Sequence, residues 1–141
     1  MLVRLMYASR VVEPAKPETL AAILKKSTQH NPETGITGVL CFSGTIFLQV
    51  LEGGRSQVSA LYNRIAQDPR HRDVVLLSLE EIDERRFAGW AMGQVNMARL
   101  NPSLLLKYSE AAVLDPYAVS GKVSMALFDE LVATASVMCL N

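Results

Sequence analysis

The order of apolar runs and amphipathic segments constrains the fold of this chain most. Residues 2–9 alternate like a strand, and residues 17–29 repeat apolar positions at helical spacing. Two further strand-like runs then flank Ser43 and Gly44, a pair typical of a hairpin turn. These patterns predict a sheet whose strands are joined by both helices and tight turns.

The remaining elements complete a βαββαβ order with an extra fifth strand. They are expected at residues 38–42, 45–51, 56–67, 74–79 and 90–95. Asn31, Pro32 and Gly35 are expected to break the first helix, because a proline disfavours the helical conformation in the residue before it and glycine interrupts helices. The order predicts an α+β fold, a ferredoxin-like sandwich with two helices on one face of an antiparallel sheet. In that topology the first and third strands are neighbours.

The chain changes character near Arg99. A short helix is expected at residues 103–108 and an amphipathic helix at residues 124–138. These C-terminal helices are expected to pack on the sheet face that the first two helices leave bare. The length of 141 residues suits one domain with a small extension. We therefore divide the chain into a domain at residues 1–98 and a helical cap at residues 99–141.

Charge and composition exclude several classes of function. The 14 basic and 14 acidic residues give a net charge of zero without a basic stripe, so neither nucleic acid nor a membrane is expected as a partner. The N-terminus lacks the features of a secretory signal. Cys41 and Cys139 lie far apart in apolar surroundings, which fits reduced thiols in a cytoplasmic protein. Two Cys and two His are too few for a zinc site, and no metal is expected.

One polar residue does not fit the apolar pattern around it. Gln49 lies inside the apolar run 46–51, and burying an amide without partners costs about 1–3 kcal/mol. A polar ligand and a second buried polar side chain are the obvious partners, and Tyr7 in the first strand is the best candidate for the second. Whether the two side chains share a sheet face depends on the register, which spacing leaves open.

Five segments of the chain resemble the BLUF family, blue-light sensors that bind a flavin. The segments lie at residues 5–9, 35–40, 47–53, 68–71 and 87–92. They follow one another in the family's order, and the resemblance covers residues 1–97. The C-terminal part resembles the stand-alone members of the family, which consist of the sensor and a helical cap. The resemblance therefore implies a sensor without enzymatic activity.

The resemblance implies a bound flavin, FAD, with FMN or riboflavin as substitutes. In the family, light drives electron and proton transfer from a tyrosine through a glutamine, whose new hydrogen bond shifts absorption to the red. Residues matching this chemistry are Tyr7, Gln49, Trp90 and Met92. Trp90 and Met92 share one face of the expected fifth strand, so spacing does not decide which one faces the glutamine. The expected flavin-binding residues are Tyr7, Ile23, Leu24, Ser27, His30, Asn31, Leu40, Phe47, Gln49, Arg64, Asp68 and His71.

The resemblance also implies how a light signal would leave the domain. Small relatives form dimers and larger rings and bind regulators. A homo-oligomer and a downstream regulatory protein are therefore expected partners, in contact with the C-terminal segment. The face around Tyr108, Tyr117 and Phe128 is the expected contact surface.

Two other functional classes fit the same fold. The first is a small enzyme, such as an acyl phosphate hydrolase or a monooxygenase without heme or flavin. Gly53, Gly54 and Arg55 would then form an anion-binding turn, but the chain lacks an evident nucleophile and base pair. The second is an interaction module whose sheet and tail only oligomerise. The colour of the purified protein separates these classes, because only a sensor is yellow with a flavin spectrum that shifts under blue light.

Overall fold

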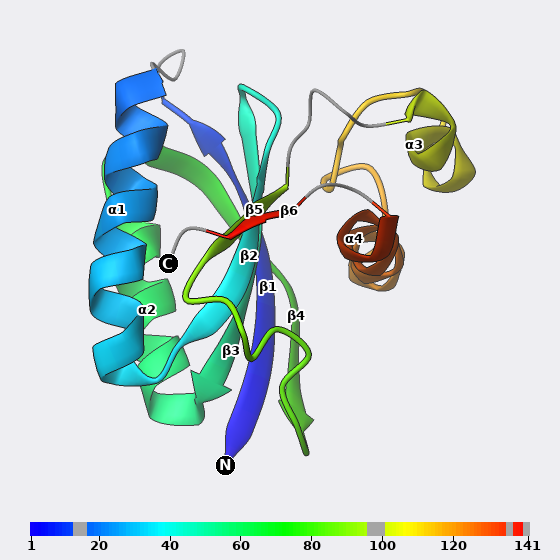
Figure 1. Cartoon of the computed structure of the whole chain (residues 1–141). Helices are drawn as coiled ribbons and strands as arrows, with labels where there is room; N and C mark the ends of the chain where they lie inside the picture. The colour runs from blue at the N-terminus through cyan, green and yellow to red at the C-terminus, as the bar shows by residue number, and fades with distance from the viewer. Residues whose placement is uncertain (13–16, 96–100, 135–136, 140–141) are drawn as a thin grey trace.

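A six-stranded sheet with helices on both faces forms the protein (Figure 1). The computed structural model describes residues 1–12, 17–95, 101–134 and 137–139, without the side chains of residues 17, 19, 20, 24, 27, 28, 134 and 137–139. The elements are β1 (Leu2–Val11), α1 (Pro17–Thr34), β2 (Thr37–Phe42), β3 (Ile46–Gly54), α2 (Arg55–Gln67), β4 (His71–Ile82), β5 (Gly93–Val95), α3 (Pro102–Tyr108), α4 (Gly121–Thr134) and β6 (Val137–Cys139).

The strand order β4-β1-β3-β2-β5-β6 places β1 and β3 beside each other near the centre of the sheet. Helices α1 and α2 cover one face, and α3 and α4 lie on the other (Figure 1). The strands pair antiparallel except for β2 and β5, which are parallel. The predicted ferredoxin-like arrangement with an added fifth strand is confirmed, and β6 adds a strand that was not predicted.

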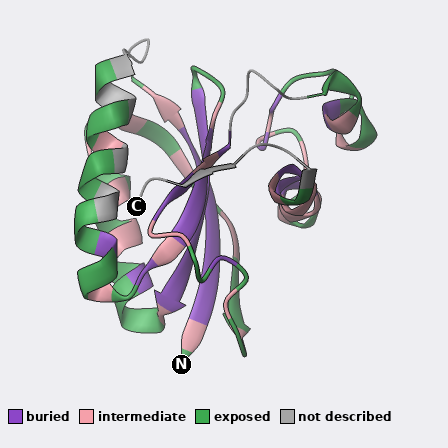
Figure 2. Cartoon of the chain, viewed as in Figure 1, coloured by how far each residue is buried: buried purple, intermediate pink, exposed green. Residues whose placement is uncertain are grey.

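Alternation along the strands builds one hydrophobic core on each face of the sheet. On β1, Leu5 and Tyr7 face α1 and α2, whereas Met6 and Ala8 face the C-terminal helices. Purple buried residues accordingly dominate the central strands in Figure 2. Burying one large apolar side chain contributes about 1.5–3 kcal/mol, so each face stabilises the sheet substantially.

The C-terminal helices complete the second core, as predicted. From α4, Leu127, Phe128 and Leu131 are buried in the same cluster as residues of β1, β2 and β3. Leu105 of α3 joins them. We name this cluster the tail-side core; it consists of the buried residues Met6, Ala8, Val39, Cys41, Leu48, Val50, Phe87, Val95, Leu105, Leu114, Leu127, Phe128 and Leu131.

Helix α1 does not end at Asn31, and that prediction is wrong. The helix runs through Pro32 and ends at Thr34, directly before Gly35, which was also expected to break it and whose φ is 71°. Glycine adopts this left-handed conformation without steric cost and commonly follows the last residue of a helix. A proline so close to the C-terminal end removes only one helical hydrogen bond. The extra turn carries Asn31 on the helix itself, with its side chain 3% exposed.

The predicted ends of two other elements are also wrong. Strand β5 begins at Gly93, so Trp90 and Met92 precede it. Helix α4 ends at Thr134, and Val137–Cys139 form β6, which pairs antiparallel with β5. The open edge of β5 offers unpaired backbone groups, which a further strand can satisfy.

In the described ranges, no helix combines the length and apolar character needed to cross a membrane. Over the same residues, His, Cys, Asp and Glu side chains form no group of three or more that could hold a metal ion.

Candidate functional site

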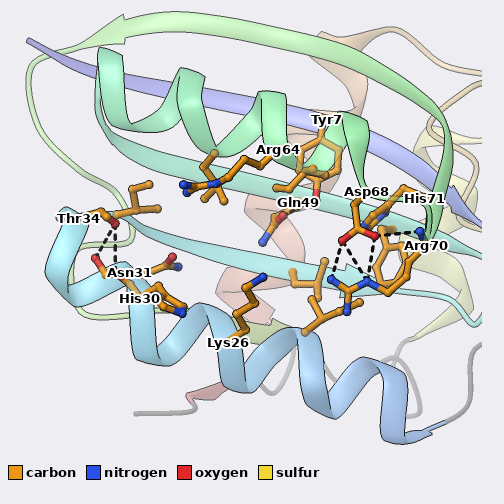
Figure 3. Close-up of a pocket in the computed structure, with 16 residues that line it drawn as sticks. Tyr7, Lys26, His30, Asn31, Thr34, Gln49, Arg64, Asp68, Arg70 and His71 are labelled. Atoms are coloured by element: carbon orange, nitrogen blue, oxygen red, sulfur yellow. Dashed lines mark hydrogen bonds and ion pairs between the residues drawn. The ribbon is translucent and has the colours of Figure 1, made fainter.

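A cavity of about 310 Å³ lies between α1, α2 and the sheet (Figure 3). Strands β1, β2 and β3 contribute its floor, including Tyr7, Leu40 and Gln49, and the two helices contribute its walls. Cavities that bind small molecules usually measure about 300–1,000 Å³ and combine apolar walls with a few polar groups. The volume and lining of this cavity meet both conditions.

Tyr7 and Gln49 meet on the cavity floor. They are direct cross-strand partners in the β1–β3 ladder, so the register brings both side chains to the helix-covered face. The Tyr7 hydroxyl donates a hydrogen bond to Gln49 Oε1. Gln49 Nε2 donates to the thioether of Met92, with 3.2 Å between nitrogen and sulfur. Both ends of the misplaced amide therefore have partners.

The partners determine the orientation of the Gln49 amide. A thioether sulfur can only accept a hydrogen bond, so the NH₂ group must face Met92 and the oxygen must face Tyr7. Tyr7 is 2% exposed. Burial, followed by the nearby Tyr62 and Asp68, raises the pKa of Tyr7. Tyr7 therefore keeps its proton and serves as the donor in this pair.

The segment before β5 closes one end of the site. Asn31 Nδ2 donates to the carbonyl oxygen of Ala91 at 2.7 Å. Met92 is 1% exposed and belongs to the buried cluster on the sheet face that α1 and α2 cover, together with Leu5 and Tyr7. Trp90 packs instead against the tail-side core, where its ring stacks on Phe87 with centroids 6.0 Å apart. The prediction that Trp90 and Met92 share one face is wrong, because both precede β5 and strand alternation does not apply.

Charged and aromatic groups line another part of the cavity (Figure 3). Arg70 pairs with Asp68 at 2.6 Å between Nη2 and Oδ2, and this hydrogen-bonded pair lowers the pKa of Asp68 to about 2. His71 Nδ1 lies 2.8 Å from Ser9 Oγ, and its ring packs on Phe47. Burial lowers the pKa of His71, so the imidazole is neutral at pH 7.

Two cationic side chains reach the cavity from opposite helices. Lys26 comes from α1 and Arg64 from α2 (Figure 3). Neither forms an ion pair with a side chain in the described part of the chain. Both cations therefore remain available to an anionic group of a ligand.

The model of the BLUF family, described as sensors of blue light using FAD, matches residues 2–93 of the 141 residues. The chain belongs to the BLUF family. The matched region is therefore a domain of the kind described as a blue-light sensor that uses FAD. A solved structure of BlsA in its photo-activated state resembles this BLUF chain with a TM-score of 0.83 and 30% sequence identity. The match covers 96% of this chain and 99% of the BlsA chain.

Curated relatives of the BLUF region include a cyclase subunit and an antirepressor. The photoactivated adenylate cyclase subunit beta of Euglena longa is 38% identical over 92 residues, which cover 64% of this chain and 11% of that protein. The blue light- and temperature-regulated antirepressor BluF of Escherichia coli K12 is 34% identical over 87 residues, covering 62% and 22%. The chain thus matches only a small part of the length of either relative.

Each predicted flavin-binding residue with a described side chain lines the BLUF cavity. These residues are Tyr7, Ile23, His30, Asn31, Leu40, Phe47, Gln49, Arg64, Asp68 and His71. The side chains of Leu24 and Ser27 lie outside the described residues. Met92 accepts a hydrogen bond from Gln49, whereas Trp90 lies on the other face of the sheet.

Sequence reasoning missed several lining residues. They are Lys26, Thr34, Ile36, Leu61, Ile65 and Arg70. Lys26 follows Ile23 by three positions and precedes His30 by four, so helical spacing could have placed it on the cavity-facing side. Arg70 lies inside the segment 68–71 that resembles the family, so it could have been predicted as a cavity residue together with Asp68 and His71.

Proposed function

We propose that this BLUF chain binds its flavin in the cavity and converts blue light into a rearrangement of the Gln49 side chain. The buried Tyr7–Gln49–Met92 chain of hydrogen bonds on the cavity floor is the observation that carries the proposal. It joins an oxidisable phenol, a two-ended amide and a weak acceptor in one line.

The residues of the cavity fit a flavin. Ile23 and Leu61 provide apolar walls for a flat ring system, and the buried Asn31 amide would bind a polar group of that ring. Gln49, also buried, presents a second amide from the floor. When bound, the flavin supplies absorption of blue light and, once excited, a strong oxidant.

Tyr7 and Gln49 then act as a coupled pair. Tyr7 is an oxidisable residue, and the bond to Gln49 Oε1 gives its hydroxyl proton a path away from the ring. Rotation of the amide exchanges the positions of the donor and acceptor ends of Gln49. The exchanged amide can no longer donate to Met92, so the contact before β5 changes.

Absorption spectra before and after blue light test this proposal. We expect a red shift of the flavin spectrum in the wild-type chain and its loss in Gln49→Leu, because leucine can neither donate nor accept. Gln57→Leu, on the exposed side of α2, is the matched control and should keep the shift. An unaltered shift in Gln49→Leu, or a chain that binds no flavin, would contradict the proposal.

FAD is the proposed flavin. Lys26 and Arg64 would pair with its phosphates, since charge-assisted bonds between cations and phosphate are among the stronger polar contacts. Titration calorimetry with riboflavin, FMN and FAD tests this assignment. Lys26→Gln and Arg64→Gln should weaken FAD binding and leave riboflavin binding nearly unchanged. Equal losses for riboflavin and FAD would contradict phosphate recognition.

We further propose that residues 1–98 form the sensor and residues 99–141 form a non-enzymatic output segment. The division follows the change in sequence character near Arg99, and the contact of Phe87 with Phe128 on α4, with ring centroids 6.2 Å apart, joins the two parts. A homo-oligomer and a downstream regulatory protein are the proposed partners of the segment. The names of the two curated relatives, a cyclase subunit and an antirepressor, indicate that such partners differ among BLUF proteins. A cytoplasmic location stays a prediction.

A further inference from the structure

A buried ion pair lies on the face of the sheet opposite the cavity. Glu52 on β3 is 0% exposed and Arg4 on β1 is 6% exposed, with 2.8 Å between Arg4 Nε and Glu52 Oε2. Arg4 and Glu52 are cross-strand partners in the same ladder as Tyr7 and Gln49. The two pairs stand three positions apart, so alternation directs them to opposite faces.

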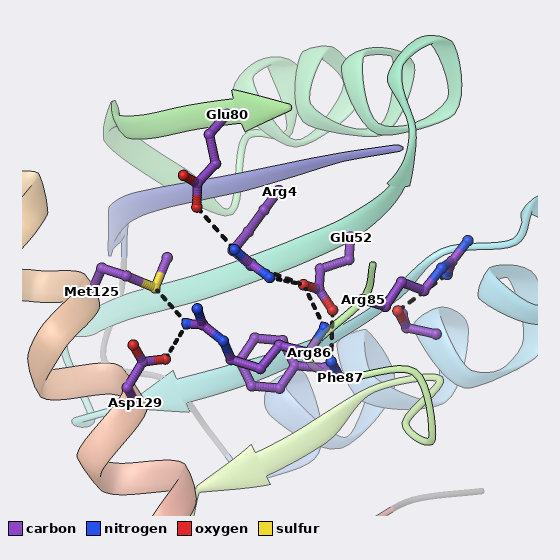
Figure 4. Close-up of polar contacts among 9 residues, drawn as sticks. Arg4, Glu52, Glu80, Arg85, Arg86, Phe87, Met125 and Asp129 are labelled. Atoms are coloured by element: carbon purple, nitrogen blue, oxygen red, sulfur yellow. Dashed lines mark hydrogen bonds and ion pairs between the residues drawn. The ribbon is translucent and has the colours of Figure 1, made fainter. Parts of the chain in front are cut away.

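Glu52 also binds the backbone of the segment that connects β4 to β5. Its Oε2 accepts from Arg86 N at 3.0 Å, and its Oε1 accepts from Phe87 N at 2.7 Å (Figure 4). The connecting segment, residues 83–92, contains no helix or strand of its own. A buried carboxylate is costly unless its oxygens are paired, and here Arg4 and two amides pair them. Glu52 is thus a fixed point for an otherwise irregular segment.

The connecting segment touches both the cavity and the tail. At its far end, Ala91 accepts from Asn31, and Met92 accepts from Gln49. At its near end, Arg86 forms an ion pair with Asp129 of α4 (Figure 4). Gln49 and α4 are therefore joined by one short stretch of chain.

We propose that Glu52 is a positioning residue for the light response, because it holds this segment so that a change at Met92 reaches α4 through Arg86. The inference rests on the proposed function of Gln49. A segment without an anchor would absorb a displacement at Met92 locally. With the backbone of Arg86 and Phe87 bound to Glu52, the segment cannot relax freely, so a displacement at Met92 changes the ion pair between the Arg86 side chain and Asp129.

Glu80 provides a matched control for the anchor. It binds the same guanidinium, with Arg4 Nη1 at 2.9 Å from Glu80 Oε1, but its side chain is 52% exposed. The amides of Arg86 and Phe87 bind Glu52 instead. Glu52→Gln and Glu80→Gln therefore make the same chemical change on two sides of one arginine.

Hydrogen exchange of the full chain in the dark tests the anchor. In Glu52→Gln, the amides of Arg86 and Phe87 should exchange about tenfold faster, because each loses a charged acceptor. In Glu80→Gln these amides should exchange as in wild type. Equal exchange in the two variants would overturn the proposed anchor.

A second pair of variants tests whether the light-induced change reaches α4 through Arg86. Neither variant replaces a buried residue. Asp129 binds Arg86, whereas its neighbour Glu130 binds Lys107 of α3. In the FAD-loaded full chain, blue light should change amide exchange along residues 121–134. Asp129→Asn should reduce that light-induced change at least about fivefold, since one ion-pair contact is lost. Glu130→Gln should keep it.

The absorption spectrum of the same samples separates the two proposals. A wild-type chain without a red shift would contradict the proposed role of Gln49, whereas the dark comparison of Glu52→Gln with Glu80→Gln would still decide the anchor. A normal red shift with equal α4 responses in Asp129→Asn and Glu130→Gln would overturn only the route through the connecting segment. A thermal melt of each variant shows whether a change in amide exchange follows from a lower melting temperature.

Discussion

At the scale of single residues, the two ends of the Gln49 amide are held by bonds of unequal strength. Oε1 accepts from a phenol, whereas Nε2 donates to a thioether, which is a weak acceptor. The bond to Tyr7 therefore contributes most to the position of the amide. Giving up the bond to Met92 costs little, which suits a side chain that must change its partners.

Substitutions of Tyr7 and Met92 should show this inequality. Tyr7→Phe leaves the buried Gln49 oxygen without its donor, so we expect the free energy of unfolding to fall by about 1–3 kcal/mol. Met92→Leu nearly conserves volume and removes only a weak acceptor, so the loss should stay below about 1.5 kcal/mol. Urea unfolding of the two variants without flavin measures both. A larger loss for Met92→Leu than for Tyr7→Phe would contradict the assignment.

The pKa of His71 predicts a dependence of stability on pH. Burial lowers this pKa below the unfolded value of about 6.5, so the unfolded chain binds more protons than the folded chain between the two pKa values. The free energy of unfolding should therefore decrease as the pH falls through this window. Urea unfolding at a series of pH values below 7 measures the slope.

Two substitutions separate the groups that titrate. His71→Gln should flatten the slope that begins near pH 6.5. Asp68, whose pKa Arg70 lowers to about 2, contributes stability that is lost only below its unfolded pKa of about 4. Asp68→Asn should therefore flatten the acidic part. It should not flatten the part near pH 6.5, because the Asp68 charge raises the pKa of His71 and its loss lowers that pKa further. An unchanged slope just below pH 6.5 in His71→Gln would assign that dependence to other groups.

At the scale of elements, the start of α4 packs closely on the edge strand. A Cβ atom at Gly121 would lie 2.2 Å from the Leu77 carbonyl oxygen on β4. Helix propensity alone favours alanine over glycine by about 1 kcal/mol, whereas overpacking costs about 1–3 kcal/mol. The steric effect should win, because the contact is with the backbone of a strand, which has little room to move.

Gly121→Ala should therefore lower the melting temperature and speed amide exchange in α4. Gly54→Ala serves as the control, because a Cβ atom there meets nothing within 4 Å and φ is −62°. Its melting temperature should stay close to that of wild type. A stabilised Gly121→Ala variant would show that α4 can move away from β4 without cost.

The sequence predicted the elements that alternate regularly and failed where the chain leaves regular structure. The side chains of β1 could be assigned to the two faces of the sheet from the period of two, because successive side chains of a strand point to opposite faces. The end of α1 did not follow from Asn31 and Pro32, because Gly35 and the buried contact of Asn31 with Ala91 outweigh one lost hydrogen bond. Tertiary context thus overrode a local signal.

The site was predictable to a similar degree. The apolar run around Gln49 identified the residue and suggested Tyr7, but only the strand register shows that the two side chains meet. The opposite placement of Trp90 and Met92 could not be predicted, because it depends on an irregular segment. The contact of Glu52 with Arg86 and Phe87 spans more than thirty positions and leaves no periodic signal.

At the scale of the whole molecule, the tail is part of the second core rather than an appendage. Phe128 and Leu131 of α4 cover Met6 and Val50 in the tail-side core, and β6 covers the edge of β5. Removing the tail would leave one face of the sheet and one edge open to solvent. Large apolar patches of this kind promote association.

Truncation after Val95 tests this dependence. We expect the shortened chain to lose stability and self-associate, because the tail-side core loses its cover. The flavin cavity on the other face should still give the red shift in whatever fraction stays folded. Light scattering and the absorption spectrum measure the two effects. A monodisperse truncated chain with the wild-type melting temperature would contradict a structural role for the tail.

The shared ladder of β1 and β3 limits how this protein can change during evolution. Tyr7–Gln49 and Arg4–Glu52 stand an odd number of positions apart, so strand alternation alone keeps one pair on each face of the sheet. A single-residue insertion between the pairs in either strand would send one partner to the wrong face. Apolar substitutions that conserve volume are therefore tolerable between these rungs, whereas insertions and deletions are not. We expect the spacing of the two pairs to be inherited as a unit, even where the residues between them vary.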